Sequence, residues 1–176
     1  NTHLNTPRIR NGEHGPEYVI AWASETGHGR EIVLSHVDVD NLLRAKAAIY
    51  AGFSVLADSV GMPIEAAERV LVGGSFGKYI NVEKAVEIGL LPDMARQGTS
   101  AWEQFHFLGN TSVKGAYLAL LDKTARARIS KIARKMTYIE LSADNSFYEA
   151  FTSALFLPHT DLGRFPSVAK EAGIGY

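Results

Sequence analysis

The chain has 176 residues, of which 46% are hydrophobic and 21% charged, and its formal net charge is −1. This length and composition suit a compact domain with a sizeable core. The absence of cysteine excludes a disulfide framework and thiolate ligation of an iron–sulfur cluster within this chain, and the balanced charge offers no electrostatic basis for binding nucleic acid.

The ends of the chain indicate its origin. Residues 1–11 are polar, lack an initiator methionine and lack the apolar stretch of a signal peptide, and no apolar run is long enough to span a bilayer. We therefore expect a cytoplasmic, C-terminal fragment of a longer protein, folded as a single domain over residues 1–176. Residues 158–176 are rich in glycine and proline and are expected to form a surface tail.

The first predicted elements are two strands and a long helix. Residues 18–23 and 32–37 are rich in β-branched and aromatic side chains and flank a glycine-containing segment, which is typical of a hairpin. Apolar positions then adopt helical spacing, with Asp38 or Asp40 as the N-cap and Gly61 at the C-terminus. The helix face predicted to pack in the core consists of Leu42, the Lys46 stem, Ile49, Phe53, Leu56 and Val60.

The rest of the chain alternates between strands and helices. After a helical turn at Pro63, strands are predicted at residues 69–72, 104–108 and 137–141. Helices are predicted at residues 82–90, 111–121, 125–136 and 147–155, the last with Asp144 as its cap. We expect Phe53, Leu56 and Val72 in the core. A hairpin followed by helix–strand units predicts an α/β fold, of the ribonuclease-H-like type.

A small-residue turn follows the strand at residues 69–72. Its sequence is Gly73-Gly74-Ser75-Phe76-Gly77, and it lies at the carboxyl end of the strand, where open α/β sheets place their ligands. Glycines without side chains let a base or ribose approach the backbone closely. An isolated turn of this composition is also explained by its dihedral angles alone, so by itself it is a weak indication of a site.

Several stretches together carry a specific resemblance. Residues 40–51 contain Arg44-Ala45-Lys46, the glycine turn lies within residues 70–79, and residues 85–92 have the sequence AVEIGLLP. With Gly109-Asn110, residues 140–142 and residues 156–159, they resemble the C-terminal region of the reductive activators of corrinoid proteins over nearly the whole chain. The resemblance implies the ATPase fold of actin, sugar kinases and heat-shock cognate chaperones: a ribonuclease-H-like subdomain with added C-terminal helices.

The resemblance also implies a function for the parent protein. Activators of this family use ATP, with Mg²⁺, to drive the return of inactive cob(II)alamin to cob(I)alamin in a corrinoid protein of a methyltransferase system. The electron comes from a ferredoxin-like domain with a 2Fe-2S cluster, which this cysteine-free chain does not contain. We expect the corrinoid protein to be the partner, and a homodimer remains open.

The same resemblance assigns site residues. In the superfamily the glycine turn contacts adenosine, and the matching residues here are Gly73, Gly74, Ser75, Phe76 and Gly77. Chaperone members also place an Arg-Ala-Lys helix segment against adenine and ribose, which assigns Lys46 to a ribose hydroxyl. Leu43 and Tyr50 replace polar residues of that pattern, so a helix lysine whose charge reaches solvent is an equally favoured interpretation of Lys46.

The phosphate-binding part of the superfamily pattern has no convincing match. The superfamily holds phosphates and Mg²⁺ with glycine-rich hairpins that carry Asp-x-Gly, and Asp161-Leu162-Gly163 fits only by letter, since no apolar strand precedes it. We interpret it as a loop, assign no catalytic residue and expect the isolated chain to be inactive. Two alternatives remain: a non-catalytic docking or dimerisation module with an actin-like fold, and a sugar or acid kinase domain.

The remaining candidates have simpler interpretations. His28 and His159 have no second ligand at metal-site spacing, so we expect surface histidines and assign no metal. One helix face, opposite Ile129 and Ile132, carries a row of cations: Arg128, Lys131 and Arg134 or Lys135. Such a row usually indicates a solvated surface and less often a docking patch.

Overall fold

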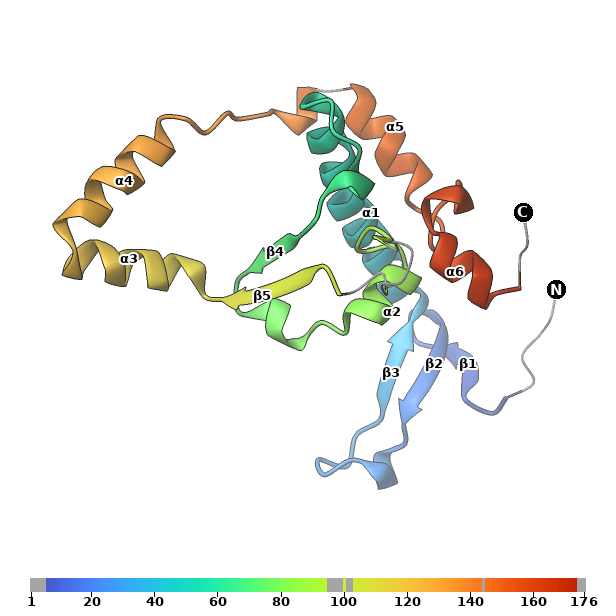
Figure 1. Ribbon diagram of the computed structural model, residues 1–176. Coiled ribbons are helices and arrows are strands. Elements are labelled where there is room, and N and C mark those ends of the chain that lie inside the picture. The colour runs from blue at the N-terminus through green and yellow to red at the C-terminus, as the bar shows by residue number, and fades with distance from the viewer. Residues whose placement is uncertain (1–5, 95–99, 101–102, 144, 174–176) are drawn as a thin grey trace. The chain divides into compact units, whose positions relative to one another are not determined.

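The computed structural model describes residues 6–94, 100, 103–143 and 145–173 (Figure 1). The chain divides into two compact units, Asn1–Ala45 and Lys46–Tyr176. The first unit contains an antiparallel sheet, and the second contains a pair of parallel strands, the hydrophobic core and most of the helices.

The first unit is a three-stranded antiparallel sheet in the order β1-β2-β3. Its strands are β1 (Ile9–Gly12), β2 (Gly15–Ala21) and β3 (Ile32–Ser35). The predicted hairpin is confirmed in β2 and β3, with Tyr18 opposite Leu34. β1 is an addition to the prediction, because its polar sequence has no strand periodicity. Arg10 of β1 is paired with Glu17 and Glu31 across the sheet, which helps to hold this strand in place.

A 24-residue helix, α1 (His36–Ser59), begins in the first unit and ends in the second. The Ser35 hydroxyl accepts from the Asp38 amide at 3.2 Å, and the Asp38 carboxylate accepts from the Ser35 amide at 2.9 Å. This reciprocal pattern is a capping box with Ser35 as the N-cap, so the prediction of Asp38 or Asp40 was wrong. The predicted C-terminus is confirmed at Gly61, whose φ is +63° and whose amide donates to the Asp58 carbonyl.

The buried face of α1 differs from the predicted one. Leu56 and Val60 are 54% and 65% exposed, and Leu42 and Ile49 are exposed as well. The buried residues are Lys46, Ala47, Tyr50, Ala51, Ser54, Val55 and Ala57. Both stripes have helical spacing, and small side chains let neighbouring segments approach the helix closely. The alanine-containing stripe is therefore the one that packs in the core, in place of the stripe with larger aliphatic residues.

The second unit has the predicted alternation of strands and helices. β4 (Val70–Gly73) and β5 (Phe105–Gly109) are parallel and are connected through η3 (Phe76–Tyr79) and α2 (Val82–Glu87). The later helices are α3 (Thr111–Leu121), α4 (Lys123–Ala133), α5 (Asn145–Ser153) and α6 (Pro166–Glu171). Single 3-10 turns occur at η2 (Ile64–Ala66), η4 (Leu141–Ala143) and η5 (Leu162–Arg164).

The last predicted strand, residues 137–141, does not form. The Tyr138 hydroxyl instead donates to Glu140 at 2.6 Å, and Glu140 accepts from the Ser142 hydroxyl as the chain enters η4. A strand needs a neighbour to complete its hydrogen bonds, and none of the strands in the described residues pairs with this segment. The predicted cap of α5, Asp144, lies outside the described residues.

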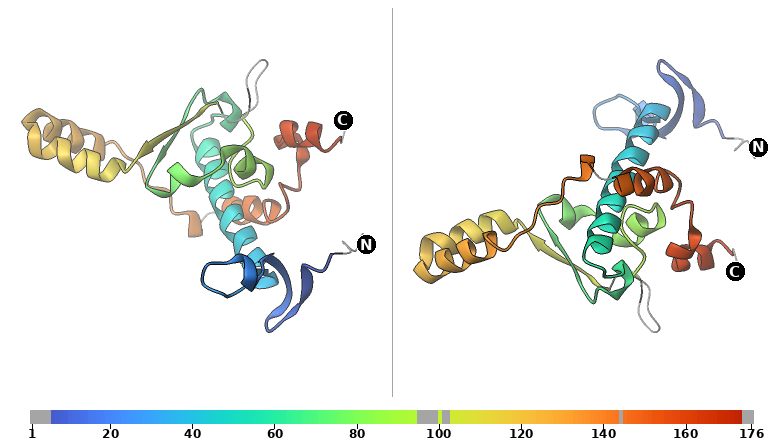
Figure 2. Two further views of the ribbon diagram at one scale, coloured as in Figure 1. Left: turned by 90° about the horizontal axis from the view of Figure 1, so that it is seen from below. Right: turned by 90° about the horizontal axis from the view of Figure 1, so that it is seen from above.

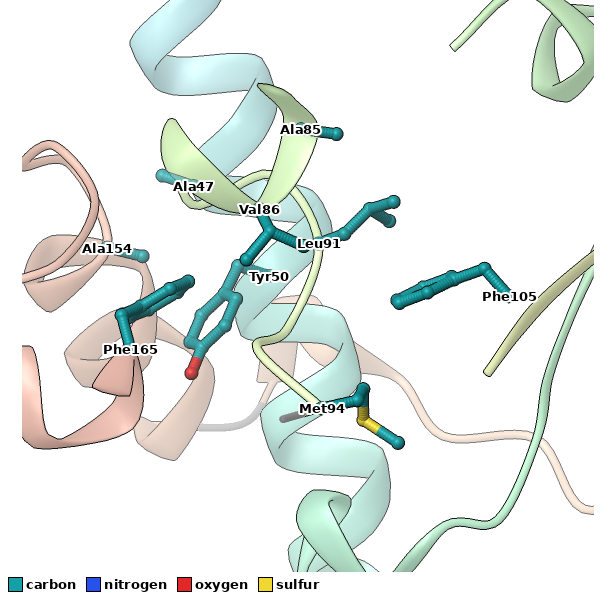
Figure 3. Packing of buried hydrophobic residues seen from close by; sticks show 9 residues of the cluster. All are labelled: Ala47, Tyr50, Ala85, Val86, Leu91, Met94, Phe105, Ala154 and Phe165. Atoms are coloured by element: carbon teal, nitrogen blue, oxygen red, sulfur yellow. The ribbon is translucent and has the colours of Figure 1, made fainter. Parts of the chain in front are cut away.

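The core of the second unit contains side chains from α1, α2, β5 and residues 154–173, which we call the C-terminal segment (Figure 3). Phe53 and Val72 pack against it as predicted. Phe165 is fully buried and Ala169 in α6 is 3% exposed. The prediction of a surface tail at residues 158–176 was therefore wrong, because Phe165 and Ala169 are buried. The cluster consists of Ala47, Tyr50, Ala85, Val86, Leu91, Met94, Phe105, Ala154 and Phe165.

Helices α3 and α4 form a hairpin that packs mainly on itself (Figure 2). α3 has its predicted bounds, and its N-cap Asn110 accepts from the Val113 amide at 3.0 Å. Asp122, between the helices, caps α4. The apolar face predicted for α3 is exposed, with Tyr117 at 61% and Leu120 at 75%. None of the described side chains of the hairpin belongs to the core cluster.

Candidate functional site

The glycine turn, residues 73–77, leaves the carboxyl end of β4 and leads into η3. Gly73 lies opposite Gly109 of β5, and the Gly74 amide donates to the Gly109 carbonyl at 2.7 Å. α3 begins just after β5, so the turn lies where both parallel strands end and two helical segments begin (Figure 1). Open α/β sheets bind ligands at this edge.

The three glycines of the turn are needed for different reasons. A Cβ at Gly73 would lie 2.7 Å from Oγ1 of Thr111, and a Cβ at Gly77 would lie 2.8 Å from Cγ1 of Val72. Packing inside the domain explains both. Gly74 has φ +112°, which other residues rarely adopt, and a Cβ there would meet no described atom within 4 Å. The backbone at Gly74 therefore borders space that a ligand can enter.

Two further predicted site residues belong to the same turn. Ser75 is exposed and has a right-handed helical conformation, with φ −72° and ψ −34°. Phe76 is the first residue of η3, and its side chain lies outside the described part of the structure. Because Ser75 carries no backbone strain, a larger side chain at this position changes the shape of the turn surface without changing its dihedral angles.

Lys46, the remaining predicted site residue, is fully buried on α1. Its ammonium donates to the carbonyl oxygens of Phe156 and Pro158, the second at 2.7 Å. Burial lowers the pKa of Lys46 to about 8, because the neutral amine is favoured away from water. In this conformation the Lys46 amine does not reach solvent, so the interpretation as a solvent-facing helix lysine was wrong, and its assignment to a ribose hydroxyl stays a prediction.

Lys46 is the first of three residues, spaced one turn apart on α1, that hold the C-terminal segment. The ring of Tyr50 packs on the ring of Phe165 with centroids 5.4 Å apart (Figure 3). The Ser54 hydroxyl accepts from the Arg164 guanidinium at 3.0 Å. The Arg-Ala-Lys segment thus begins a helix face that anchors the C-terminal segment, a role that the sequence analysis missed.

His159 belongs to the same contact and is only 8% exposed, which corrects the expectation of a surface histidine. Its ring lies 5.3 Å from that of Tyr50, and its Nδ1 accepts from the Asp161 amide at 2.9 Å. Burial lowers the pKa of His159, and the neutral ring carries its proton on Nε2. Asp161 caps η5 by accepting from the Gly163 amide, so the interpretation of this Asp-x-Gly string as a loop is confirmed.

The structure also bears on the metal ligands and membrane-spanning helices considered from the sequence. His28 is exposed, in the connection between β2 and β3. Within the described residues, no group of three His, Cys, Asp or Glu side chains could hold a metal ion. The helices in that part of the chain are too short or too polar to cross a membrane.

The mixed α/β fold, with a parallel strand that ends in a glycine turn, matches that of an ASKHA, or actin-like, domain. The family model described as the C-terminal domain of RACo, the ASKHA domain, matches residues 1–169. The chain belongs to this family. The resemblance stated from the sequence and the predicted fold class are thereby confirmed.

Two relatives are much longer than this chain. The corrinoid activation enzyme RamQ of Eubacterium limosum is 35% identical over 134 residues, which cover 76% of this chain and 22% of RamQ. A solved structure of a reductive activator for corrinoid, iron–sulfur protein is 50% identical, with a TM-score of 0.81, and the match covers 92% of this chain and 25% of that one. The chain therefore spans about a quarter of the length of these relatives.

Proposed function

We propose that this chain supplies the adenosine half of the nucleotide site in an ATP-dependent reductive activator of a corrinoid protein. Family membership and the names of both relatives support the activity. The observation that carries the site assignment is Gly74, whose backbone borders free space at the edge where β4 and β5 end. A flat base or ribose can lie against a backbone without side chains, and a bulkier residue would prevent that approach.

The proposal assigns the glycine turn to adenosine and gives Lys46 a structural role. In this proposal the nucleoside lies against residues 73–77, while Lys46 holds the C-terminal segment to α1 through the carbonyls of Phe156 and Pro158. Bound ATP, with Mg²⁺, supplies the free energy that an uphill reduction of cob(II)alamin requires. The 2Fe-2S cluster belongs to a part of the activator that contains cysteine, and no residue of this chain is assigned to catalysis.

The test is a change at Ser75, because this residue is exposed and its backbone is unstrained. Ser75→Leu in the full-length activator should weaken ATP binding about tenfold or more, which corresponds to the loss of about 1.4 kcal/mol of contact energy. Isothermal titration calorimetry measures the affinity. Gly74→Val is a poorer test, since its φ of +112° strains any side chain there whether or not nucleotide binds.

Ser24→Leu is the matched control, because Ser24 is also an exposed serine in a short helical turn and lies far from β4 in the sequence. It should leave the ATP affinity unchanged. Equal affinities of wild type and Ser75→Leu would remove the adenosine assignment. If the wild-type protein nevertheless bound the corrinoid protein, the domain would be a docking module without a nucleotide site.

A Lys46→Met variant separates the two roles considered for Lys46. If Lys46 only anchors the C-terminal segment, the melting temperature should fall and the ATP affinity of the folded protein should stay within about twofold of the wild-type value. If the ATP affinity instead fell tenfold or more at an unchanged melting temperature, Lys46 would bind the ribose.

A further inference from the structure

The α3–α4 hairpin has a large net positive charge, although the chain as a whole is nearly neutral. We call residues 111–136 the basic hairpin. It contains seven of the 18 lysines and arginines but only one of the 19 acidic residues, so its net charge is +6, whereas the rest of the chain sums to −7. The single acid, Asp122, is used as the cap of α4. The near-neutral charge of the whole chain therefore conceals a strongly uneven distribution.

The cations of the basic hairpin form no salt bridge among the described residues. Lys114 and Arg126 donate only to backbone carbonyls, those of Leu108 and Ala119. Three cations crowd the C-terminal end of α4 and line a shallow depression: Lys131, Arg134 and Lys135. The helix dipole favours cations at this end of α4, whereas like charges three or four residues apart repel one another, so the two effects oppose each other within the isolated fold.

The basic hairpin also exposes apolar side chains. Val113, Tyr117 and Leu120 form a stripe on α3 and are 61%, 61% and 75% exposed. Protein interfaces combine aromatic and aliphatic side chains at the centre with charges at the rim. Nucleic acid is a poorer occupant, because the remainder of the chain, at −7, repels a polyanion. An anionic membrane is also less favoured, because the basic hairpin contains no tryptophan or phenylalanine, and Tyr117 alone could anchor it in a lipid surface.

We propose that the basic hairpin docks an acidic surface of a protein partner. This inference rests on the proposed function, in which that surface belongs to the corrinoid protein. An activator must associate with its target, transfer an electron and leave again. Opposite charges suit that cycle, because electrostatic steering raises the association rate more than it prolongs the complex.

The experiment neutralises the crowded cations in the full-length activator. The triple variant Lys131→Gln, Arg134→Gln and Lys135→Gln keeps side chains of good helix propensity, so α4 should still fold. At low ionic strength, stopped-flow measurement should give association with the corrinoid protein about tenfold slower than for wild type. At 0.3 M salt the two rates should converge, since screening removes the contribution of charge.

The matched control neutralises three exposed cations elsewhere, namely Arg30, Arg69 and Lys170. Its association rate should stay within about twofold of wild type. Carbodiimide treatment of the wild-type complex should also join Lys131 or Lys135 to a carboxylate of the corrinoid protein. Wild-type rates in the hairpin variant, or an equal loss in the control, would overturn the proposal. Hairpin-dependent sedimentation with phosphatidylglycerol vesicles, without any effect on the corrinoid protein, would overturn it in favour of a membrane.

The outcome also separates this proposal from the function on which it rests. A wild-type activator that fails to bind the corrinoid protein contradicts the proposed function and, with it, the docking surface. A wild-type activator that binds while the hairpin variant binds equally well contradicts only the docking surface.

Discussion

Lys46 is a buried cation whose environment makes a testable contribution to stability. Its pKa is about 8 in the folded chain against an ordinary value of 10.5, so between these pH values the unfolded chain binds a proton that the folded chain does not. The free energy of unfolding should therefore rise with pH across this window, by up to about 3 kcal/mol at roughly 1.4 kcal/mol per pKa unit. Urea unfolding at pH 7.5 and pH 10 measures the change.

The control for that prediction is Lys46→Met, which removes the titrating group and keeps a long apolar stem. Subtracting the pH dependence of the variant from that of wild type isolates Lys46 from other groups that titrate at alkaline pH. If the free energies of unfolding of the two proteins changed in parallel between pH 7.5 and pH 10, the buried ammonium would have its ordinary pKa. Lys46 would then not be held away from water.

The difference between the glycine turn and Lys46 shows which site residues a sequence can place. Glycines after an apolar strand are local signals, and residues 73–77 do form a turn at the end of β4. Lys46 has its partners, Phe156 and Pro158, 110 and 112 residues away along the chain. No local pattern near Lys46 distinguishes a lysine that donates to distant carbonyls from one that faces a ligand or solvent.

The same distinction holds for whole elements. The bounds of α3 were predicted correctly, and the structure adds a local N-cap at Asn110. The predicted strand at residues 137–141 failed, because a strand depends on a neighbour that its own sequence does not specify. The segment at residues 158–176 was mistaken for a tail because it contains several glycines and prolines. The spacing of Leu162, Phe165 and Ala169 is the apolar signal that could have revealed its packing.

The α1 helix and the C-terminal segment give a direct test of the corrected core. Phe165 is fully buried and packs on Tyr50, so Phe165→Ala should lower the free energy of unfolding by about 3–5 kcal/mol. Leu56 is 54% exposed on the opposite stripe, and Leu56→Ala should cost less than about 1 kcal/mol, since alanine also favours the helix. Chemical denaturation compares the two variants. A larger loss for Leu56→Ala than for Phe165→Ala would restore the originally predicted face.

At the scale of the whole molecule, the chain combines a candidate nucleoside turn with no described cluster of acids for a metal ion, and it spans about a quarter of the length of its relatives. If residues 73–77 contact only adenosine, the isolated chain should bind adenosine and ATP with the same weak affinity, because the triphosphate adds no contact. In the full-length activator, ATP with Mg²⁺ should bind at least about 100-fold more tightly than adenosine, a difference of about 2.7 kcal/mol.

Calorimetric titration of both ligands into both proteins, with and without Mg²⁺, measures these affinities. The ratio of the ATP and adenosine affinities within each protein matters more than the absolute affinities. Lower stability of the shorter chain would weaken the binding of both ligands equally. A tenfold preference of the isolated chain for ATP over adenosine, dependent on Mg²⁺, would contradict the prediction. It would mean that this chain holds phosphate as well, and the search for the residues responsible would then begin at the N-terminus of α3, where Asn110 and Thr111 lie beside the glycine turn.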